Sequence, residues 1–192
     1  MNKKIRAVLD KLKKNRHIYW NIPREVGQFL NFLIRDRKYK SVLEIGTSTG
    51  YSALWIAEAL SHTQGHLYTI ESHQKERAKL AKETFKKSGL KNITLIEGHA
   101  PEAIPKTPKF FDLIFLDATK EEYHLYFTAL KSRIKKGGMI IADNTESHKK
   151  ELKKYFQAIE NSKEFTNFPL KIGSGLTVSI KGFCRNSKHI TL

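Results

Sequence analysis

The spacing of apolar residues divides the chain into a helical beginning and a longer region of alternating short runs. Within the first fifteen residues the apolar side chains recur at the spacing of one helix face, which predicts a basic amphipathic helix. These side chains are Ile5, Val8, Leu9 and Leu12. A second helix is expected to begin near Pro23, a favoured first-turn residue. Its apolar side would comprise Val26, Phe29, Leu30, Leu33 and Ile34.

From residue 41 onward, five short apolar runs are each followed by a helical stretch. The runs read SVLEI, HLYTIE, NITLIE, FDLIFLD and GGMIIAD, and the helices are expected at 51–61, 74–88, 101–104, 121–134 and 148–161. Strands that alternate with helices in this way predict an α/β fold, with a parallel sheet covered by helices on both faces.

The C-terminal segment FPLKIGSGLTVSIKG predicts two extended stretches that meet at Gly173-Ser174-Gly175, because glycine adopts positive φ in a tight turn. This pair is expected to be antiparallel and to lie at the sheet edge. The predicted organisation is a helical cap over residues 1–36, a core over 37–181 and a polar, loose tail over 182–192.

The chain carries a formal net charge of +16, and residues 1–40 hold twelve Lys and Arg against three acids. Clustered basic side chains can contact nucleic-acid phosphates, or they can simply form a solvated surface, so both interpretations stay open.

The single cysteine, Cys184, excludes an internal disulfide. No apolar run approaches the ~20 residues that cross a bilayer, and no secretory signal is present, so a cytoplasmic protein is expected.

The first apolar run ends in the loop from Glu44 to Ser52, which leads into a helix. Gly46 and Gly50 allow a tight turn and a close approach to a ligand, while Ser52 lies near a helix N-terminus that can receive a carboxylate. A dinucleotide-binding fingerprint would also need glycine at positions 48 and 51, which hold Ser and Tyr. A nicotinamide-dependent oxidoreductase is therefore disfavoured.

The second run ends at Glu71, 25 residues beyond Gly46. A carboxylate at about that interval commonly accepts the hydroxyl groups of a ribose, although capping of the next helix is the alternative. After the third run, Gly98-His99-Ala100 forms a small-residue loop that could pass an adenine ring, with His99 equally suited to a structural role.

The fourth and fifth runs end in oxygen-bearing side chains. Asp117 ends the fourth run with Lys120 three residues later, and Asp143 and Asn144 end the fifth. Carboxylate and amide oxygens on adjacent strand ends suit a hard cation such as Mg²⁺, whereas each residue alone could be a helix cap.

These residues and their surroundings resemble the class I, divalent-metal-dependent O-methyltransferases, which include catechol and caffeoyl-CoA methyltransferases. The resemblance is carried by VLEIGTSTGYSALWIAEAL, YTIE, FDLIFLDATKEEYHLYF, GGMIIADN and PREVGQFLNFLI, over roughly residues 20–181. It implies a Rossmann-like fold with a mostly parallel seven-stranded sheet, an S-adenosylmethionine cofactor and a divalent cation.

The resemblance also implies roles for individual residues. Lys120 would be the base, and Asp117, Asp143 and Asn144 would bind Mg²⁺. The candidate cofactor set is Glu44, Gly46, Ser52, Glu71, Ser72, Gly98, His99, Ala100 and Asp117. The chain departs from the family after Asn144, where it reads Thr145-Glu146-Ser147-His148, and at 173–175, where relatives have Gly-Asp-Gly. The substrate-side wall is thus left undefined.

The acceptor stays open at this point. A small hydroxylated aromatic such as a catechol fits the resemblance, and a 5-hydroxyuridine in tRNA is the alternative, for which the basic N-terminal region would supply phosphate contacts. A binding module without catalysis is disfavoured by the intact acid and lysine set. The apolar side of the first helix could pack on its own core or on a second subunit, which would make a homodimer.

Overall fold

The computed structural model describes residues 1–14, 16–73 and 75–182. The helices are α1 (Lys3–Lys14), α2 (Arg16–Tyr19), α3 (Arg24–Asp36), α4 (Tyr51–Thr63), α5 (Arg77–Ser88), α6 (Tyr123–Leu130) and α7 (Lys153–Glu160), and three short 3₁₀ turns are η1 (Ile104–Lys106), η2 (Lys120–Glu122) and η3 (Lys131–Arg133). The strands are β1 (Ser41–Ile45), β2 (His66–Glu71), β3 (Ile93–Glu97), β4 (Phe111–Leu116), β5 (Ile134–Asp143), β6 (Phe165–Leu170) and β7 (Leu176–Lys181).

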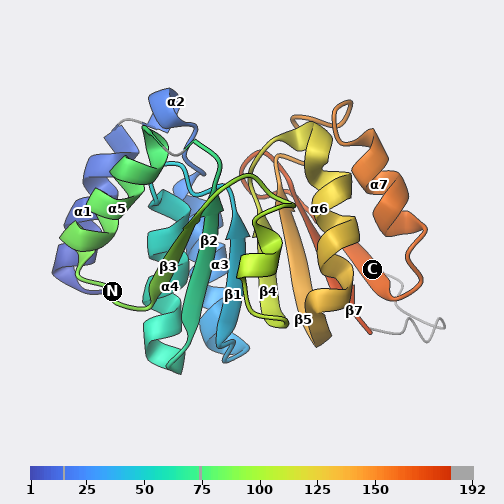
Figure 1. The fold of residues 1–192 in the computed structure, drawn as a ribbon, viewed down its shortest axis with the longest axis horizontal. Helices are drawn as coiled ribbons and strands as arrows, with labels where there is room; N and C mark the ends of the chain where they lie inside the picture. The colour runs from blue at the N-terminus through green and yellow to red at the C-terminus, as the bar shows by residue number, and fades with distance from the viewer. Residues whose placement is uncertain (15, 74, 183–192) are drawn as a thin grey trace.

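The seven strands form one sheet in the order β3-β2-β1-β4-β5-β7-β6 (Figure 1). The first five strands are parallel, and β7 pairs antiparallel with both β5 and β6. The chain winds outward from β1 to β3 and then returns to the other side of β1 through β4. This confirms the predicted α/β fold with an antiparallel pair at one edge, and it places a topological switch point between β1 and β4.

Two apolar cores lie on opposite faces of the sheet, because alternate side chains of each strand point to opposite faces. Val42 of β1 belongs to the core shared with α3 and α4, whereas Leu43 and Ile45 belong to the core shared with α6 and α7. The layers are therefore helices, sheet and helices (Figure 1).

The N-terminal helices pack on one of these faces. Helix α1 buries Ile5 and Leu9 in the core that also contains α3 and α4, and it leaves its lysines exposed. Helix α3 buries Val26 and Leu30 in the same core, so it forms part of the layer that covers the sheet.

Several helix boundaries differ from the sequence expectation: α4 extends to Thr63, and α5 begins at Arg77. The short helix expected at 101–104 is a turn that leads into η1, and the helix expected over 121–134 is α6 flanked by η2 and η3. The last helix begins at Lys153 rather than at 148. The reason is tertiary: the backbone N–H groups of Thr145 and Glu146 donate to Gly175 and Ser174 in the β6–β7 turn, which holds the preceding segment in turns.

Within the described residues, none of the helices combines the length and the apolar character that a membrane span requires. Cys184 and the predicted tail beyond Gly182 lie outside the described residues.

Candidate active site

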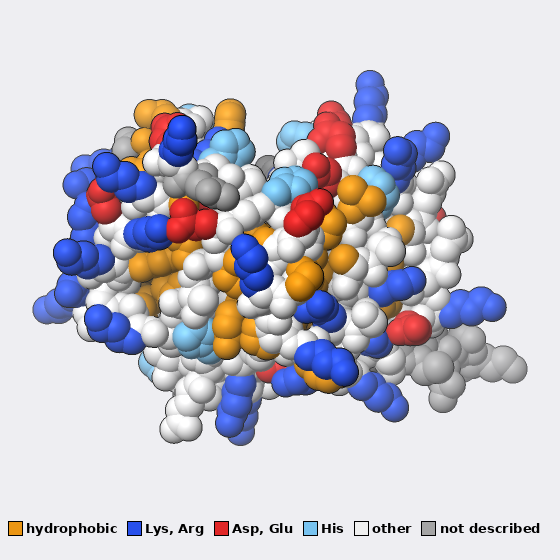
Figure 2. All heavy atoms as spheres, in the orientation of Figure 1, with side chains coloured by type: hydrophobic (Ala, Val, Ile, Leu, Met, Phe, Trp, Pro, Cys, Tyr) orange, Lys and Arg blue, Asp and Glu red, His pale blue; other side chains and the backbone are white. Residues whose placement is uncertain are grey.

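A cleft of about 570 Å³ opens beyond the carboxyl ends of β1, β2, β4 and β5. Its walls come from the strand ends and from two segments that reach over them, and its lining comprises Tyr19, Trp20, Gly46, Ser48, Glu71, Ser72, His73, Arg77, Asp117, Ala118, Thr119, Lys120, Asn144 and His148. Figure 2 shows the molecular surface hollowed at its upper edge, between the α2 and α6 sides of Figure 1. The cleft lies at the switch point, where open α/β sheets bind their ligands.

The turn after β1 needs its glycine because the backbone of the neighbouring strand end is very close. Gly46 has φ of +99°, and a Cβ at this position would lie 2.0 Å from the carbonyl oxygen of Asp117. The Gly46 N–H donates to Ile70, and the Asp117 N–H donates to Ile45, at 3.0 and 2.9 Å. The ends of β2, β1 and β4 are thereby joined around the floor of the cleft.

Glu71 at the end of β2 is buried and held by two backbone groups. Its Oε2 accepts the N–H of Ser48 at 2.7 Å, and its Oε1 accepts the N–H of His73 at 2.8 Å. Each carboxylate oxygen has two acceptor sites, so this side chain retains capacity for ligand hydroxyl groups while its position is fixed. That geometry fits the ribose role expected for Glu71.

Glu44 lies beneath the cleft and does not line it. Its side chain is fully buried and accepts the hydroxyl of Thr69 at 2.6 Å, and Thr69 in turn lies 2.6 Å from the hydroxyl of Thr47. Burial raises the pKa of Glu44 to about 8, against the smaller lowering effect of its hydroxyl neighbours. The carboxyl is therefore mostly protonated at neutral pH.

Asp117 and Lys120 form an ion pair at the cleft. The Nζ of Lys120 lies 3.0 Å from Oδ1 of Asp117, and both side chains are largely buried. Lys120 also lies over the ring of Tyr123, with Nζ 5.2 Å from its centroid. The Tyr123 hydroxyl donates to the Leu116 carbonyl at the end of β4, which fixes that ring. The lysine is thus held at the strand end by an acid and an aromatic face.

Asn144, at the end of β5, lines both the cleft and a second cavity of about 290 Å³, which Asp143 also lines. Asn144 has φ of +63°, a left-handed conformation that asparagine tolerates better than most residues. With Asp117 on the adjacent strand, the donors are two carboxylates and one amide, the oxygen chemistry that Mg²⁺ accepts. Nowhere in the described residues do three or more His, Cys, Asp or Glu gather as a metal cluster, so water and substrate oxygens would have to complete this set.

Besides Glu44, four of the expected cofactor residues do not line the cleft. Ser52 is buried in the first turn of α4, and Gly98, His99 and Ala100 follow β3. His99 instead bridges two acids, Glu102 at 3.0 Å and Glu122 at 2.9 Å. The hydrogen bond to Glu102 is the main cause that raises the pKa of His99. This arrangement suits the structural alternative for His99, and the cofactor roles of all four stay predictions.

The sequence did not predict that Tyr19, Trp20 and Arg77, from the α2 segment and α5, would line one side of the cleft. Trp20 is exposed, and the guanidinium of Arg77 lies 5.1 Å from its ring centroid, which joins the N-terminal segment to α5. The hydroxyl of Ser48 donates to the Tyr19 carbonyl at 3.0 Å and holds the same segment against the glycine turn. No periodicity marks these residues, because they meet only after the chain folds.

The segment after Asn144, where the chain departs from the family pattern, contacts the β6–β7 turn. Gly175 has φ of +88°, and a Cβ there would lie 2.6 Å from the backbone nitrogen of Glu146. Gly173 packs in turn against Pro23 and Val26 at the start of α3. Three distant segments therefore meet beside Asn144.

The model of the O-methyltransferase family matches residues 3–168, which is most of the chain. The chain belongs to the O-methyltransferase family. This confirms the resemblance drawn from the strand-end motifs.

Two curated relatives show the range of names within the family. A catechol O-methyltransferase from Niastella koreensis is 35% identical over 123 residues, covering 62% of this chain and 55% of the relative. Caffeoyl-CoA O-methyltransferase 2 from Populus trichocarpa is 35% identical over 136 residues, covering 66% of this chain and 54% of the relative. The chain thus spans about half the length of the curated relatives it matches.

Solved structures match over a larger share of both chains. The SAH-bound methyltransferase PaMTH1 from Podospora anserina superposes with a TM-score of 0.86 at 24% identity, covering 94% of this chain and 88% of that one. The O-methyltransferase TomG from Streptomyces achromogenes, in complex with SAM, gives a TM-score of 0.80 at 23% identity, covering 91% and 89%. These likenesses show that the fold is Rossmann-like.

Proposed function

We propose that this protein transfers the methyl group of S-adenosylmethionine to a hydroxyl of a small aromatic acceptor such as a catechol, with Lys120 as the base. The family match and the names of the relatives support methyl transfer to oxygen. The observation that carries the proposal is the Asp117–Lys120 ion pair, which lies in the same cleft as Glu71 and Asn144. In this proposal the methyl donor and the proton acceptor would therefore lie in one cavity.

The chain's residues would divide the reaction between them. Glu71 would receive the ribose hydroxyls of the methyl donor, and the glycine turn would let the donor lie close to the backbone. A phenol has a pKa near ~10, so its proton must be removed before its oxygen displaces the sulfur from the methyl group. Lys120, oriented by Asp117 and Tyr123, would accept that proton as the new carbon–oxygen bond forms and the carbon–sulfur bond breaks.

Asp117, Asp143 and Asn144 would hold a divalent cation. When bound, Mg²⁺ stabilises an ionised acceptor oxygen and favours the neutral amine of a neighbouring lysine.

The basic N-terminal region favours a second candidate acceptor, a 5-hydroxyuridine in tRNA. The exposed face of α1 presents several lysines, including Lys3, Lys4 and Lys11, on a chain of net charge +16. Such a surface suits phosphate contacts, whereas an uncharged catechol has no phosphate for these lysines to bind.

The deciding experiment is a methyl-transfer assay that compares a catechol panel with undermodified tRNA, each with Mg²⁺ and with a chelator. We expect turnover of at least one catechol that chelation abolishes and that added Mg²⁺ restores. Calorimetry with S-adenosylmethionine should give the same affinity with and without chelator. Full turnover in chelator would contradict the metal assignment, and methylation of tRNA alone would replace the small acceptor.

A further inference from the structure

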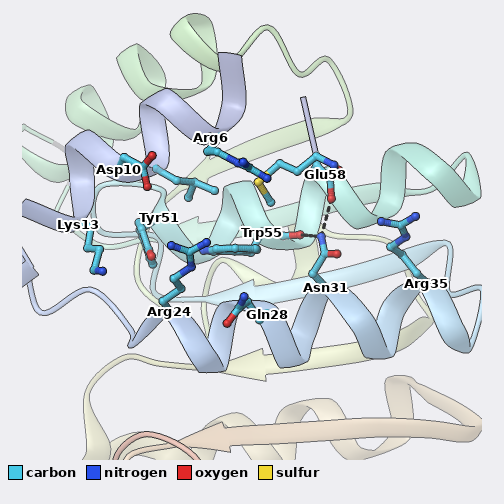
Figure 3. Close-up of a pocket in the computed structure, with 12 residues that line it drawn as sticks. Arg6, Asp10, Lys13, Arg24, Gln28, Asn31, Arg35, Tyr51, Trp55 and Glu58 are labelled. Carbon is cyan, nitrogen blue, oxygen red and sulfur yellow. Dashed lines mark hydrogen bonds and ion pairs between the residues drawn. The ribbon is translucent and has the colours of Figure 1, made fainter. Parts of the chain in front are cut away.

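A polar pocket of about 240 Å³ lies between α1, α3 and α4, away from the active-site cleft. It shares no lining residue with that cleft. Figure 3 shows the side chains that surround it. Each helix contributes one stripe at the spacing of a helix face. The stripes are Arg6, Asp10 and Lys13 on α1; Arg24, Gln28, Asn31 and Arg35 on α3; and Tyr51, Trp55 and Glu58 on α4.

The two ends of this pocket differ in how their charges are balanced. At one end, Glu58 accepts the amide of Asn31 at 2.6 Å and lies 3.1 Å from His62 (Figure 3). Burial alone would raise the pKa of Glu58, but these hydrogen bonds outweigh it and the pKa is lowered. Glu58 is therefore an ionised group, and it already has a positive partner in the Met1 amino group at 3.4 Å as well as these hydrogen bonds.

The opposite end holds two positively charged donors, Arg24 and Lys13. Arg24 lies there with Tyr51 beside one end of the Trp55 ring (Figure 3). Neither Arg24 nor Lys13 makes an ion pair with a carboxylate in the part of the chain that the structure describes. Asp10, the one acid on the α1 stripe, is exposed and likewise makes none there.

Trp55 supplies an independent observation. Its side chain is only 7% exposed, and its Nε1 has no hydrogen-bond partner among the described residues. The ring cannot simply rotate away, because it packs so tightly on Gly27 that a Cβ there would lie 2.4 Å from it. A buried indole N–H without an acceptor is unfavourable unless something else supplies the acceptor.

We propose that this pocket binds a phosphate group, with Lys13, Arg24 and the indole N–H of Trp55 as its donors. Phosphate offers several acceptor oxygens, so one group can satisfy a guanidinium, an ammonium and an N–H together. Arg6 and Arg35 add positive charge to the same walls. A further cavity of about 230 Å³ shares Lys13, Arg24 and Gln28 with this pocket and is also lined by the exposed acid Glu25. It leaves room for the remainder of a phosphate ester.

The test is calorimetric titration of the full chain with inorganic phosphate at constant ionic strength. Arg24→Gln removes the charge from an exposed residue, and Trp55→Phe removes the N–H while keeping an aromatic ring. Lys150→Gln, an exposed lysine outside the pocket, is the matched control for net charge. We expect one saturable site whose affinity falls about tenfold or more in both pocket variants and stays unchanged in the control.

The absence of saturable binding, or equal binding by wild type and Arg24→Gln, overturns the proposal. Because Arg24 is exposed, that variant decides the question even if Trp55→Phe does not fold. Competition with a short single-stranded RNA distinguishes two sources of the phosphate. Displacement by RNA that Arg24→Gln weakens assigns the site to a nucleic-acid backbone, and lack of displacement assigns it to a free phosphate or small ester.

Discussion

Two buried glutamates near the cofactor side of the cleft differ in what surrounds them. Glu71 lines the cleft and accepts two backbone N–H groups, whereas Glu44 lies beneath it with one hydroxyl donor to its Oε2. The two side chains point to the same face of the sheet, and they differ in position: Glu44 pairs with Thr69, two residues before Glu71, so Glu71 lies further toward the carboxyl ends of the strands. The resemblance implies a cofactor contact for Glu44, and that role stays a prediction; in the structure its side chain accepts the hydroxyl of Thr69, which in turn lies beside the hydroxyl of Thr47.

Glu44 should make stability depend on pH. Its pKa of about 8 in the folded protein exceeds the ordinary value of 4.5, so between these values the folded state binds more protons than the unfolded state. The free energy of unfolding should fall with rising pH across that window, by up to about 1.4 kcal/mol per pH unit from this one group.

Glu44→Gln keeps the shape of the neutral side chain and cannot ionise. Thermal unfolding of both proteins from pH 5 to 9 should show a shallower slope in the variant and a relative gain in its stability at the alkaline end. Parallel curves for the two proteins would rule out the raised pKa.

Substitution of Lys120 tests its proposed role as the base. Lys120→Ala should retain its affinity for S-adenosylmethionine and lose turnover by about a hundredfold or more, because the proton acceptor is gone while Glu71 is untouched. Lys135→Ala is a matched control, since Lys135 pairs with Asp112 at the other end of β4 at 2.7 Å. Calorimetry and a methyl-transfer assay measure the two effects, and normal turnover in Lys120→Ala would remove the assignment.

At the scale of single elements, the strand ends were predictable and the segments that cover them were not. Asp117 and Asn144 could be placed together from the sequence because carboxyl ends of parallel strands share one edge of the sheet. Trp20 and Arg77 could not, since their contact depends on how α2 folds back over α5. The late start of α7 was missed for the same reason, because hydrogen bonds from a distant turn override local helix preference.

The β6–β7 turn gives a prediction for the acceptor-side wall. Gly175→Ala should cost about 1–3 kcal/mol of stability, since φ is positive and the new methyl meets the backbone of Glu146. Gly137→Ala is the control, because its φ is +78° but nothing lies within 4 Å of its Cβ position. Chemical denaturation should show a larger loss at 175 than at 137, and equal losses would mean that backbone strain alone matters.

At the scale of the whole molecule, the positive charge is spread widely, and Figure 2 shows Lys and Arg around much of the outline. The sequence predicted this excess, including its concentration in residues 1–40, but not how these side chains are arranged in space. The structure locates one concentration in the pocket between three helices, where side chains from α1 and α3 face each other across α4.

Salt dependence separates the two acceptor candidates at this scale. Turnover of an uncharged catechol should change by less than about twofold between about 50 and 200 mM salt, because no counterions are released when it binds. A tRNA acceptor would lose affinity by orders of magnitude over that range. A filter-binding series with tRNA, run beside the catechol kinetics, measures both, and a steep salt dependence of the catechol reaction would contradict the expectation.

The strand order β3-β2-β1-β4-β5-β7-β6 has a consequence for how such a protein can diversify. Residues 41–97 build the half of the sheet that ends in the glycine turn and Glu71. Residues 111–181 build the half that carries Asp117, Lys120, Asp143 and Asn144, together with the β6–β7 turn. Within the sheet, the two halves pair along the β1–β4 seam. If residues 144–181 form the acceptor side, as proposed, exchanging this segment between relatives should change the acceptor preference and leave the affinity for S-adenosylmethionine unchanged.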